Sequence, residues 1–92
     1  MNEYRIFETD NFIKEIDKIE GKNRKLIKGK LKIRTYNQLR EQRHYGINIK
    51  KLKNYNPETW RYRIGNFRVF YETNEEEKIV NIIGISTRQN TY

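Results

Sequence analysis

Three arginines lie close together in the second half of the chain, in a segment with the alternating pattern of β-strands. Apolar side chains alternate with Arg61 and Arg63 between positions 60 and 64, and a period of two places both arginines on one face of the strand. Arg68 follows the turn signal Gly65-Asn66 and can join them from the next strand. Because a planar guanidinium binds phosphate oxygens through two hydrogen bonds, this grouping predicts a surface for a phosphate-bearing ligand.

The charge of the whole chain supports the same expectation. Twenty Lys and Arg face twelve Asp and Glu, for a net charge of +8 and a pI near 9.8. Residues 21–40 and 42–57 contain no acidic residue; the second segment includes Lys50, Lys51 and Lys53. Such a balance favours a polyanionic partner, with nucleic acid first, an acidic protein second and an anionic membrane third. The alternative for the first segment is a solvated helix face.

Composition limits the class of protein. With 92 residues, 35% hydrophobic and 13% aromatic, the chain is expected to form a single domain over residues 1–92 with a thin core. It has no cysteine, which excludes disulfides, thiolate catalysis and Cys-based zinc sites. We find no glycine-rich phosphate loop, metal-ligand cluster or Ser-His-Asp set, and expect neither cofactor nor metal. No apolar stretch could span a bilayer or form a signal-peptide core, so a cytoplasmic location is expected.

Periodicity predicts an α+β fold in the order strand, helix, helix and three strands. The first helix is expected to begin at Thr9 or Asp10 and to end at Gly21. The other predicted segments are a strand over 4–7, a helix over 23–40, a loop over 42–59, and strands over 60–64, 67–71 and 79–86. The predicted core includes Trp60, Tyr62, Phe67, Val69 and Tyr71. The second helix is weaker, with an apolar face of Leu26, Ile27, Leu31 and Leu39.

Three segments of the sequence resemble the RelE/ParE superfamily of toxins. They are Lys51-Leu52-Lys53, the hairpin from Trp60 to Glu72, and the ending Thr87-Arg88-Gln89-Asn90-Thr91-Tyr92. The resemblance covers nearly the whole chain, and the hairpin is its most specific part. It implies two N-terminal helices packed on a curved, mostly antiparallel sheet.

The resemblance also implies a function and partners. RelE-like members cut mRNA in the ribosomal A site, whereas ParE-like members inhibit DNA gyrase and are not nucleases; both are held inactive by an antitoxin. We therefore expect a ribosome-dependent endoribonuclease toxin, with a gyrase inhibitor or a degenerate toxin that only binds its antitoxin as alternatives. The expected partners are an acidic RelB-like antitoxin, the ribosome and mRNA, with no membrane and no small-molecule cofactor.

Metal-independent RNA cleavage needs a base for the 2′-hydroxyl, positive charge on the phosphorane and an acid for the leaving oxygen. By the resemblance, the catalytic set is Arg61, Arg63, Arg68, Arg88 and Tyr92, with Lys50, Lys51 and Lys53 binding RNA. If the last strand is regular, Arg88 shares a face with Val80, Ile82 and Ser86.

The proton acceptor stays open at the level of the sequence. Well-known RelE-type sites have lysines where this chain has Arg61 and Arg63, and arginine does not give up its proton. Lys51, Lys53, Tyr92 and the lone His44 are the alternatives. In a further alternative the ribosome provides much of the positioning, and the protein then needs only modest proton chemistry. Arg61 and Arg63 have a second interpretation, as partners of antitoxin carboxylates.

Overall fold

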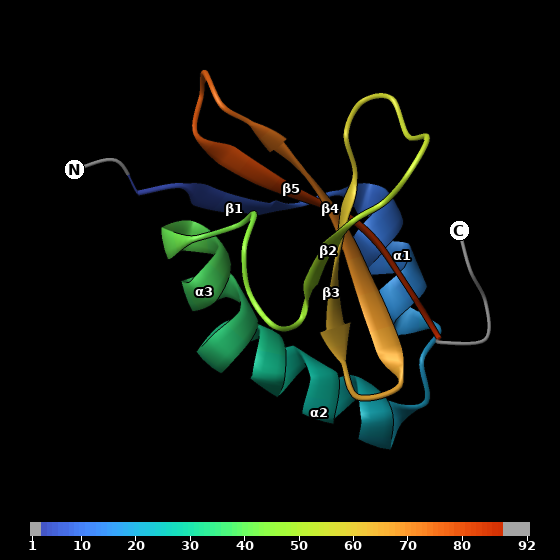
Figure 1. The fold of residues 1–92 in the computed structure, drawn as a ribbon. Helices are drawn as coiled ribbons and strands as arrows, with labels where there is room; N and C mark the ends of the chain where they lie inside the picture. The colour runs from blue at the N-terminus through green and yellow to red at the C-terminus, as the bar shows by residue number, and fades with distance from the viewer. Residues whose placement is uncertain (1–2, 88–92) are drawn as a thin grey trace.

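The computed structural model describes residues 3–87 of the chain as a five-stranded sheet with helices packed on one face (Figure 1). The elements are β1 (Arg5–Glu8), α1 (Asp10–Asp17), α2 (Gly21–Lys30), the π-helical turn η1 (Leu31–Thr35), α3 (Tyr36–Glu41), β2 (Ile49–Lys51), β3 (Trp60–Ile64), β4 (Phe67–Asn74) and β5 (Ile79–Thr87). The strand order is β1-β5-β4-β3-β2, and only the β1–β5 pair is parallel. The predicted α+β class and mostly antiparallel sheet are confirmed.

One strand was missing from the sequence prediction. β2 lies inside the segment predicted to be a loop, and its three residues pair antiparallel with the start of β3. Two of the three are lysines at positions 50 and 51. Such a short, charged segment has no visible alternation, so its strand conformation depends on the pairing with β3.

The first helix begins as predicted but ends earlier. The Thr9 hydroxyl accepts a hydrogen bond from the Phe12 backbone N–H at 3.2 Å, which makes Thr9 the N-cap. Phe12 and Ile16 are buried in the core. The helix stops at Asp17, and Gly21 is the first residue of α2 rather than the end of α1. The prediction for Gly21 was therefore wrong: this glycine starts a helix.

α2, η1 and α3 form one continuous helical segment along the sheet (Figure 1). Its buried residues are four positions apart: Ile27, Leu31, Thr35 and Leu39, each at most 2% exposed. Four-residue steps on an ideal α-helix drift by about 40° each. The backbone N–H of Tyr36 bonds to the carbonyl of Leu31, five residues back, so the η1 turn holds an extra residue and reduces this drift. Leu26, predicted on the apolar face, is 58% exposed.

The core lies between this helical segment, α1 and the sheet. Tyr62, Val69 and Tyr71 are buried as predicted, while Trp60 and Phe67 are partly buried at its border. The buried phenols have hydrogen-bond partners: Tyr62 donates to Gln38 Oε1 at 3.0 Å, and Tyr71 donates to the Arg43 carbonyl at 2.8 Å. These bonds connect the sheet to the end of the helical segment.

β5 contains an irregularity that changes which side chains face the core. On β4, Phe70 pairs with Gly84 and the next residue pairs with Ile82, so Ile83 is an extra residue in β5. Beyond Ile82, β5 no longer pairs with β1, and α1 covers this free edge of β5. The Asn11 amide donates to the Ile83 carbonyl at 2.8 Å, and Glu15 Oε1 accepts from the Ile85 N–H at 2.9 Å. Within the described part of the chain, no helix is long and apolar enough to cross a membrane.

Candidate nucleic-acid interface

The β3–β4 hairpin places three arginines on the face of the sheet that lies opposite the helices. Arg63 pairs directly with Arg68, and Arg61 pairs with Phe70. The alternate residues of both strands point into the core, so these positions point away from it. Gly65 makes the connecting turn with a φ of +56°, a conformation that favours glycine. We call Arg61, Arg63 and Arg68 the arginine face.

The arginine face concentrates positive charge. Burial lowers the pKa of Arg61, and the neighbouring charges of Arg63 and Arg68 lower it further. Arg61 and Arg68 are half-buried, whereas Arg63 is exposed. In residues 3–87, no ion pair reaches any of the three. A bound anion would therefore relieve a repulsion that no carboxylate of the described chain offsets.

A backbone carbonyl holds part of this face in place. The carbonyl of Asn48 accepts from Arg61 Nη1 at 3.1 Å and from the backbone N–H of Arg63 at 3.0 Å. The first bond orients the guanidinium, and the second extends the pairing of the β2 region with β3. Sequence reasoning missed Asn48 because every residue type carries a backbone carbonyl, so its role has no signal in the side-chain pattern.

β5 adds Ser86 to the arginine face. Ser86 pairs with Arg68, whereas Val80 and Ile82 are buried in the core. The expectation that Ser86 shares a face with Val80 and Ile82 was therefore wrong, because the extra residue at Ile83 reverses the alternation. The expected position of Arg88 depended on that regular strand. Arg88 and Tyr92 both lie outside the described residues.

The three lysines predicted to bind RNA separate into different environments. Lys50 pairs with Arg61 across β2 and β3, so it shares the arginine face. Lys51 pairs with Trp60 instead, and its Nζ lies 3.0 Å from Glu58 Oε2. Lys53 is exposed in the following loop. The structure thus brings Lys50 to the arginines and directs Lys51 elsewhere.

His44 lies away from the arginine face. Its ring packs against Trp60 with 4.6 Å between centroids, and its Nε2 lies 3.6 Å from Glu75 Oε2. Trp60 belongs to the helix side of β3, because it pairs with the buried Tyr71. His44 is therefore a contact between the α3–β2 loop and the sheet. Among the described residues, no group of three or more His, Cys, Asp or Glu is placed to hold a metal ion.

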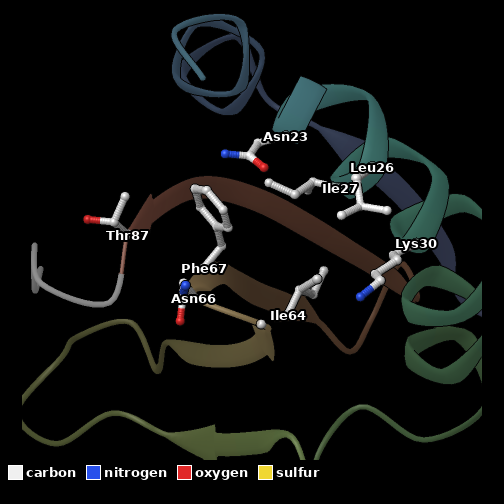
Figure 2. A pocket seen from close by; sticks show the side chains of 9 residues that line it. Asn23, Leu26, Ile27, Lys30, Ile64, Asn66, Phe67 and Thr87 are labelled. Carbon is white, nitrogen blue, oxygen red and sulfur yellow. The ribbon is translucent and has the colours of Figure 1, made fainter. Parts of the chain in front are cut away.

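An open groove lies between α2 and the hairpin turn (Figure 2). It encloses about 740 Å³. Its apolar walls are Leu26 and Ile27 from the helix, and Ile64 and Phe67 from the hairpin. Figure 2 shows Lys30 extending from α2 toward the hairpin at one end of this groove.

Comparison with known proteins gives a family and a fold. Residues 6–92 match the family described as the ParE toxin of the type II toxin–antitoxin system parDE. The comparison with curated proteins finds no match.

Several solved structures share the fold. One is a chain of the RelBE2 toxin–antitoxin complex from Mycobacterium tuberculosis, with a TM-score of 0.73, 18% identity, and coverage of 98% of this chain and 97% of that chain. A second, from the RelE–RelB complex of Pyrococcus horikoshii, has a TM-score of 0.64 and 20% identity over 99% and 100% of the two chains. The isolated RelE toxin of Escherichia coli has a TM-score of 0.67 and 20% identity over 96% and 87%.

Proposed function

We propose that this chain, a member of the ParE toxin family of type II toxin–antitoxin systems, cleaves mRNA on the ribosome. The ParE family lies within the RelE/ParE superfamily. The arginine face carries this proposal. It presents three guanidinium groups, on two paired strands, to the face of the sheet opposite the helices of residues 3–87. Charge of this kind is what the transition state of phosphodiester cleavage requires.

In this mechanism the chain supplies charge stabilisation. Attack of the ribose 2′-hydroxyl on the neighbouring phosphorus forms a phosphorane with more negative charge than the ground state. We assign Arg68 and Arg63 to binding its oxygens, because they are paired across the two strands. Arg61, which donates to the Asn48 carbonyl, adds charge beside them. Arginine does not give up its proton in proteins, so the arginine face does not supply the base.

Proton transfer therefore needs other groups. Lys50 is in register with Arg61 and is the lysine that we place beside the substrate. By the resemblance, Arg88 holds the scissile phosphate together with Arg68 and also serves near the leaving group, while Tyr92 stacks on a base or holds the substrate. Both keep these roles as part of the proposal. We assign the alignment of the 2′-hydroxyl with the scissile bond mainly to the ribosome, because correct alignment alone contributes several kcal/mol to such reactions.

The family name favours a second candidate function. The matching family is described by ParE, and ParE-like members of the superfamily inhibit DNA gyrase without chemistry of their own. The same arginine face would then bind a gyrase subunit or its DNA. The two functions differ in their product, since only a nuclease leaves new RNA ends.

We further propose an acidic antitoxin as the regulatory partner. Several chains with this fold were solved as toxin–antitoxin complexes, and the present chain carries a net charge of +8. The groove between α2 and the hairpin offers such a partner an apolar floor with Lys30 at its end. An antitoxin segment with apolar residues on one side and acidic residues beside them would fit this groove.

The discriminating experiment has three arms. Expression without antitoxin should arrest growth, and co-expression of the acidic protein encoded beside the toxin gene should relieve the arrest. In a reconstituted translation reaction, mapping of mRNA 5′ ends should show cuts in the ribosomal A site. A DNA gyrase supercoiling assay with the same protein should be unaffected. Intact mRNA together with inhibited supercoiling would instead establish the gyrase function.

A further inference from the structure

A second cationic site lies beside the arginine face, where the edge of β3 meets the long helical segment. A cleft of about 320 Å³ is lined by Lys30, Arg34 and Thr35 from the helix and by Asn48, Arg63 and neighbouring residues of the sheet side. Its three charged residues are all cations. We call this the Lys30–Arg34–Arg63 cleft.

Two features of the backbone create this cleft. β2 stops pairing with β3 at Tyr62, so beyond the bond to Asn48 the edge of β3 is left open toward the helix. On the helix side, the cleft falls at the η1 turn, which contains both Arg34 and Thr35. The π turn buries Thr35 against the sheet while Arg34, one residue earlier, stays exposed.

The charges of the cleft are not neutralised within the described chain. The ion pairs formed by residues 3–87 involve neither Lys30 nor Arg34 nor Arg63. Three cations around a small space repel one another, and a bound anion removes that cost. Asn48 also lines the cleft, as a polar and uncharged residue. Its volume lies near the lower end of the range for ligand sites, which suits a phosphate with its sugar better than a large cofactor.

Arg63 belongs to both the cleft and the arginine face, so the two sites are adjacent. We propose that the Lys30–Arg34–Arg63 cleft binds a second backbone phosphate of the RNA strand whose scissile phosphate lies on the arginine face. This inference rests on the proposed function and deepens it. The cleft would fix the strand at a neighbouring nucleotide and set its register relative to the arginines. Phosphates of this kind position a strand without reading its sequence.

Salt-dependent binding of a short single-stranded RNA tests the proposal. The cleft variant Lys30→Gln/Arg34→Gln removes two charges but keeps long side chains, and Lys22→Gln/Lys25→Gln removes two charges from exposed positions of the same helix. Each phosphate contact contributes about 0.7 to the slope of log affinity against log salt for single strands. The cleft variant should lose roughly that much slope, whereas the control should match the wild type.

Two results of these measurements would overturn the cleft proposal. Equal slopes for both variants and the wild type would overturn the cleft proposal. So would a cleft variant with unchanged RNA binding but weaker binding to a polyglutamate peptide, because the cleft would then recognise an acidic protein. If the double variant melts earlier than the wild type, Arg34→Gln alone is measured against Lys25→Gln by the same criterion.

Failure of this proposal can be told apart from failure of the proposed function. Loss of mRNA cleavage in Arg68→Ala, with no change of slope in the cleft variant, keeps the nuclease and overturns the cleft. RNA binding by the wild type that does not depend on salt would overturn both.

Discussion

Arg68 lies on β4 between its two cross-strand partners, Arg63 on β3 and Ser86 on β5. Under the proposed mechanism it contacts the phosphorane oxygens directly. Removing one preorganised cationic donor from such a site costs about 3 kcal/mol of transition-state stabilisation, or on the order of a hundredfold in rate. We expect this loss for Arg68→Ala in the A-site mRNA cleavage assay. Arg68→Lys should fall between, because it keeps the charge but loses the two-bond grip.

The comparison needs a measure of folding on the same preparations. Arg68 is half-buried on the open face and outside the hydrophobic core, so Arg68→Ala should melt close to the wild type. Lys25→Ala, on the exposed side of α2, is the matched control and should cut normally. Wild-type cleavage by Arg68→Ala, or a loss explained entirely by unfolding, would remove Arg68 from the active surface.

At the scale of residues, sequence patterns predicted side-chain faces but not backbone contacts. The shared face of Arg61, Arg63 and Arg68 follows from the period of two and from a turn signal, and both are local properties. The contact of Asn48 with Arg61 joins positions 13 residues apart through a carbonyl, which no pattern of side chains encodes. Ser86 was placed on the wrong face because one extra residue in β5 reverses every later position.

The extra residue in the η1 turn can be tested by deletion. If a π turn is an α-helix with one residue inserted, deleting an exposed residue within it should restore a regular helix and keep both ends in register. Ile33 is 73% exposed inside η1. We expect its deletion to leave the free energy of unfolding within about 1 kcal/mol of the wild type, as measured by urea titration.

Deletion of Asn37 in α3 is the contrasting variant. It also removes an exposed residue, but from a regular turn, so it rotates Leu39 by about 100° relative to Thr35. Leu39 is fully buried, and loss of its packing should cost at least about 2 kcal/mol. If the two deletions destabilise the protein equally, the extra residue in η1 is not what keeps the buried positions aligned.

The turn between β3 and β4 depends on the backbone conformation of Gly65. Gly65 has a φ of +56°, and no atom lies within 4 Å of where a Cβ would stand. The cost of Gly65→Ala is therefore conformational and should be about 1 kcal/mol of stability. Gly65→Asn should cost less, because asparagine tolerates this region better. Thermal melting of both variants checks the order, and the reverse order would mean that an unseen contact dominates.

At the scale of elements, the sequence predicted those that depend on nearby residues and missed those that depend on pairing or packing with distant segments. Thr9 or Asp10 was predicted as the cap because such a side chain acts within one turn, and the structure selects Thr9. β2 was missed because its strand conformation comes from β3. Leu26 was misplaced because it is apolar like its neighbour Ile27, and the sequence does not show which of the two faces the sheet. Gly21 shows the same limit, since glycine is common at either end of a helix and only the packing decides which.

At the scale of the whole molecule, one carboxylate joins segments from both ends of the described chain. Glu75, in the turn between β4 and β5, accepts hydrogen bonds from the hydroxyls of Tyr4 and Thr73. His44 approaches it from the α3–β2 loop at 3.6 Å. The Arg43 guanidinium lies 3.5 Å from the centre of the Tyr4 ring, which places a second cation beside the cluster. The N-terminal segment, the α3–β2 loop and the β4–β5 turn therefore meet at Glu75.

This cluster predicts how stability depends on pH. The hydrogen bond from Tyr4 holds the pKa of Glu75 below its ordinary value, with smaller contributions from Thr73, His44 and Arg43. A carboxyl whose pKa is lower in the folded state stabilises the fold fully above its unfolded pKa, and this contribution is lost as the pH falls through the folded pKa. The wild type should therefore lose more stability than Glu75→Gln on acidification below about pH 5. Urea titrations across that range measure the difference.

Glu76→Gln is the control that separates this cluster from general charge effects. Glu76 is exposed in the same turn, so its substitution changes the net charge by the same amount without removing the partner of Tyr4. It should lose stability in acid as the wild type does. Because the cluster fastens the N-terminal segment to the sheet on the side away from the arginine face, the Glu75 variant should keep its mRNA cleavage at neutral pH. Parallel acid titrations for wild type and Glu75→Gln would mean that the carboxylate is not a folding contact, and that the molecule is held together there by Arg43 and the Tyr4 ring.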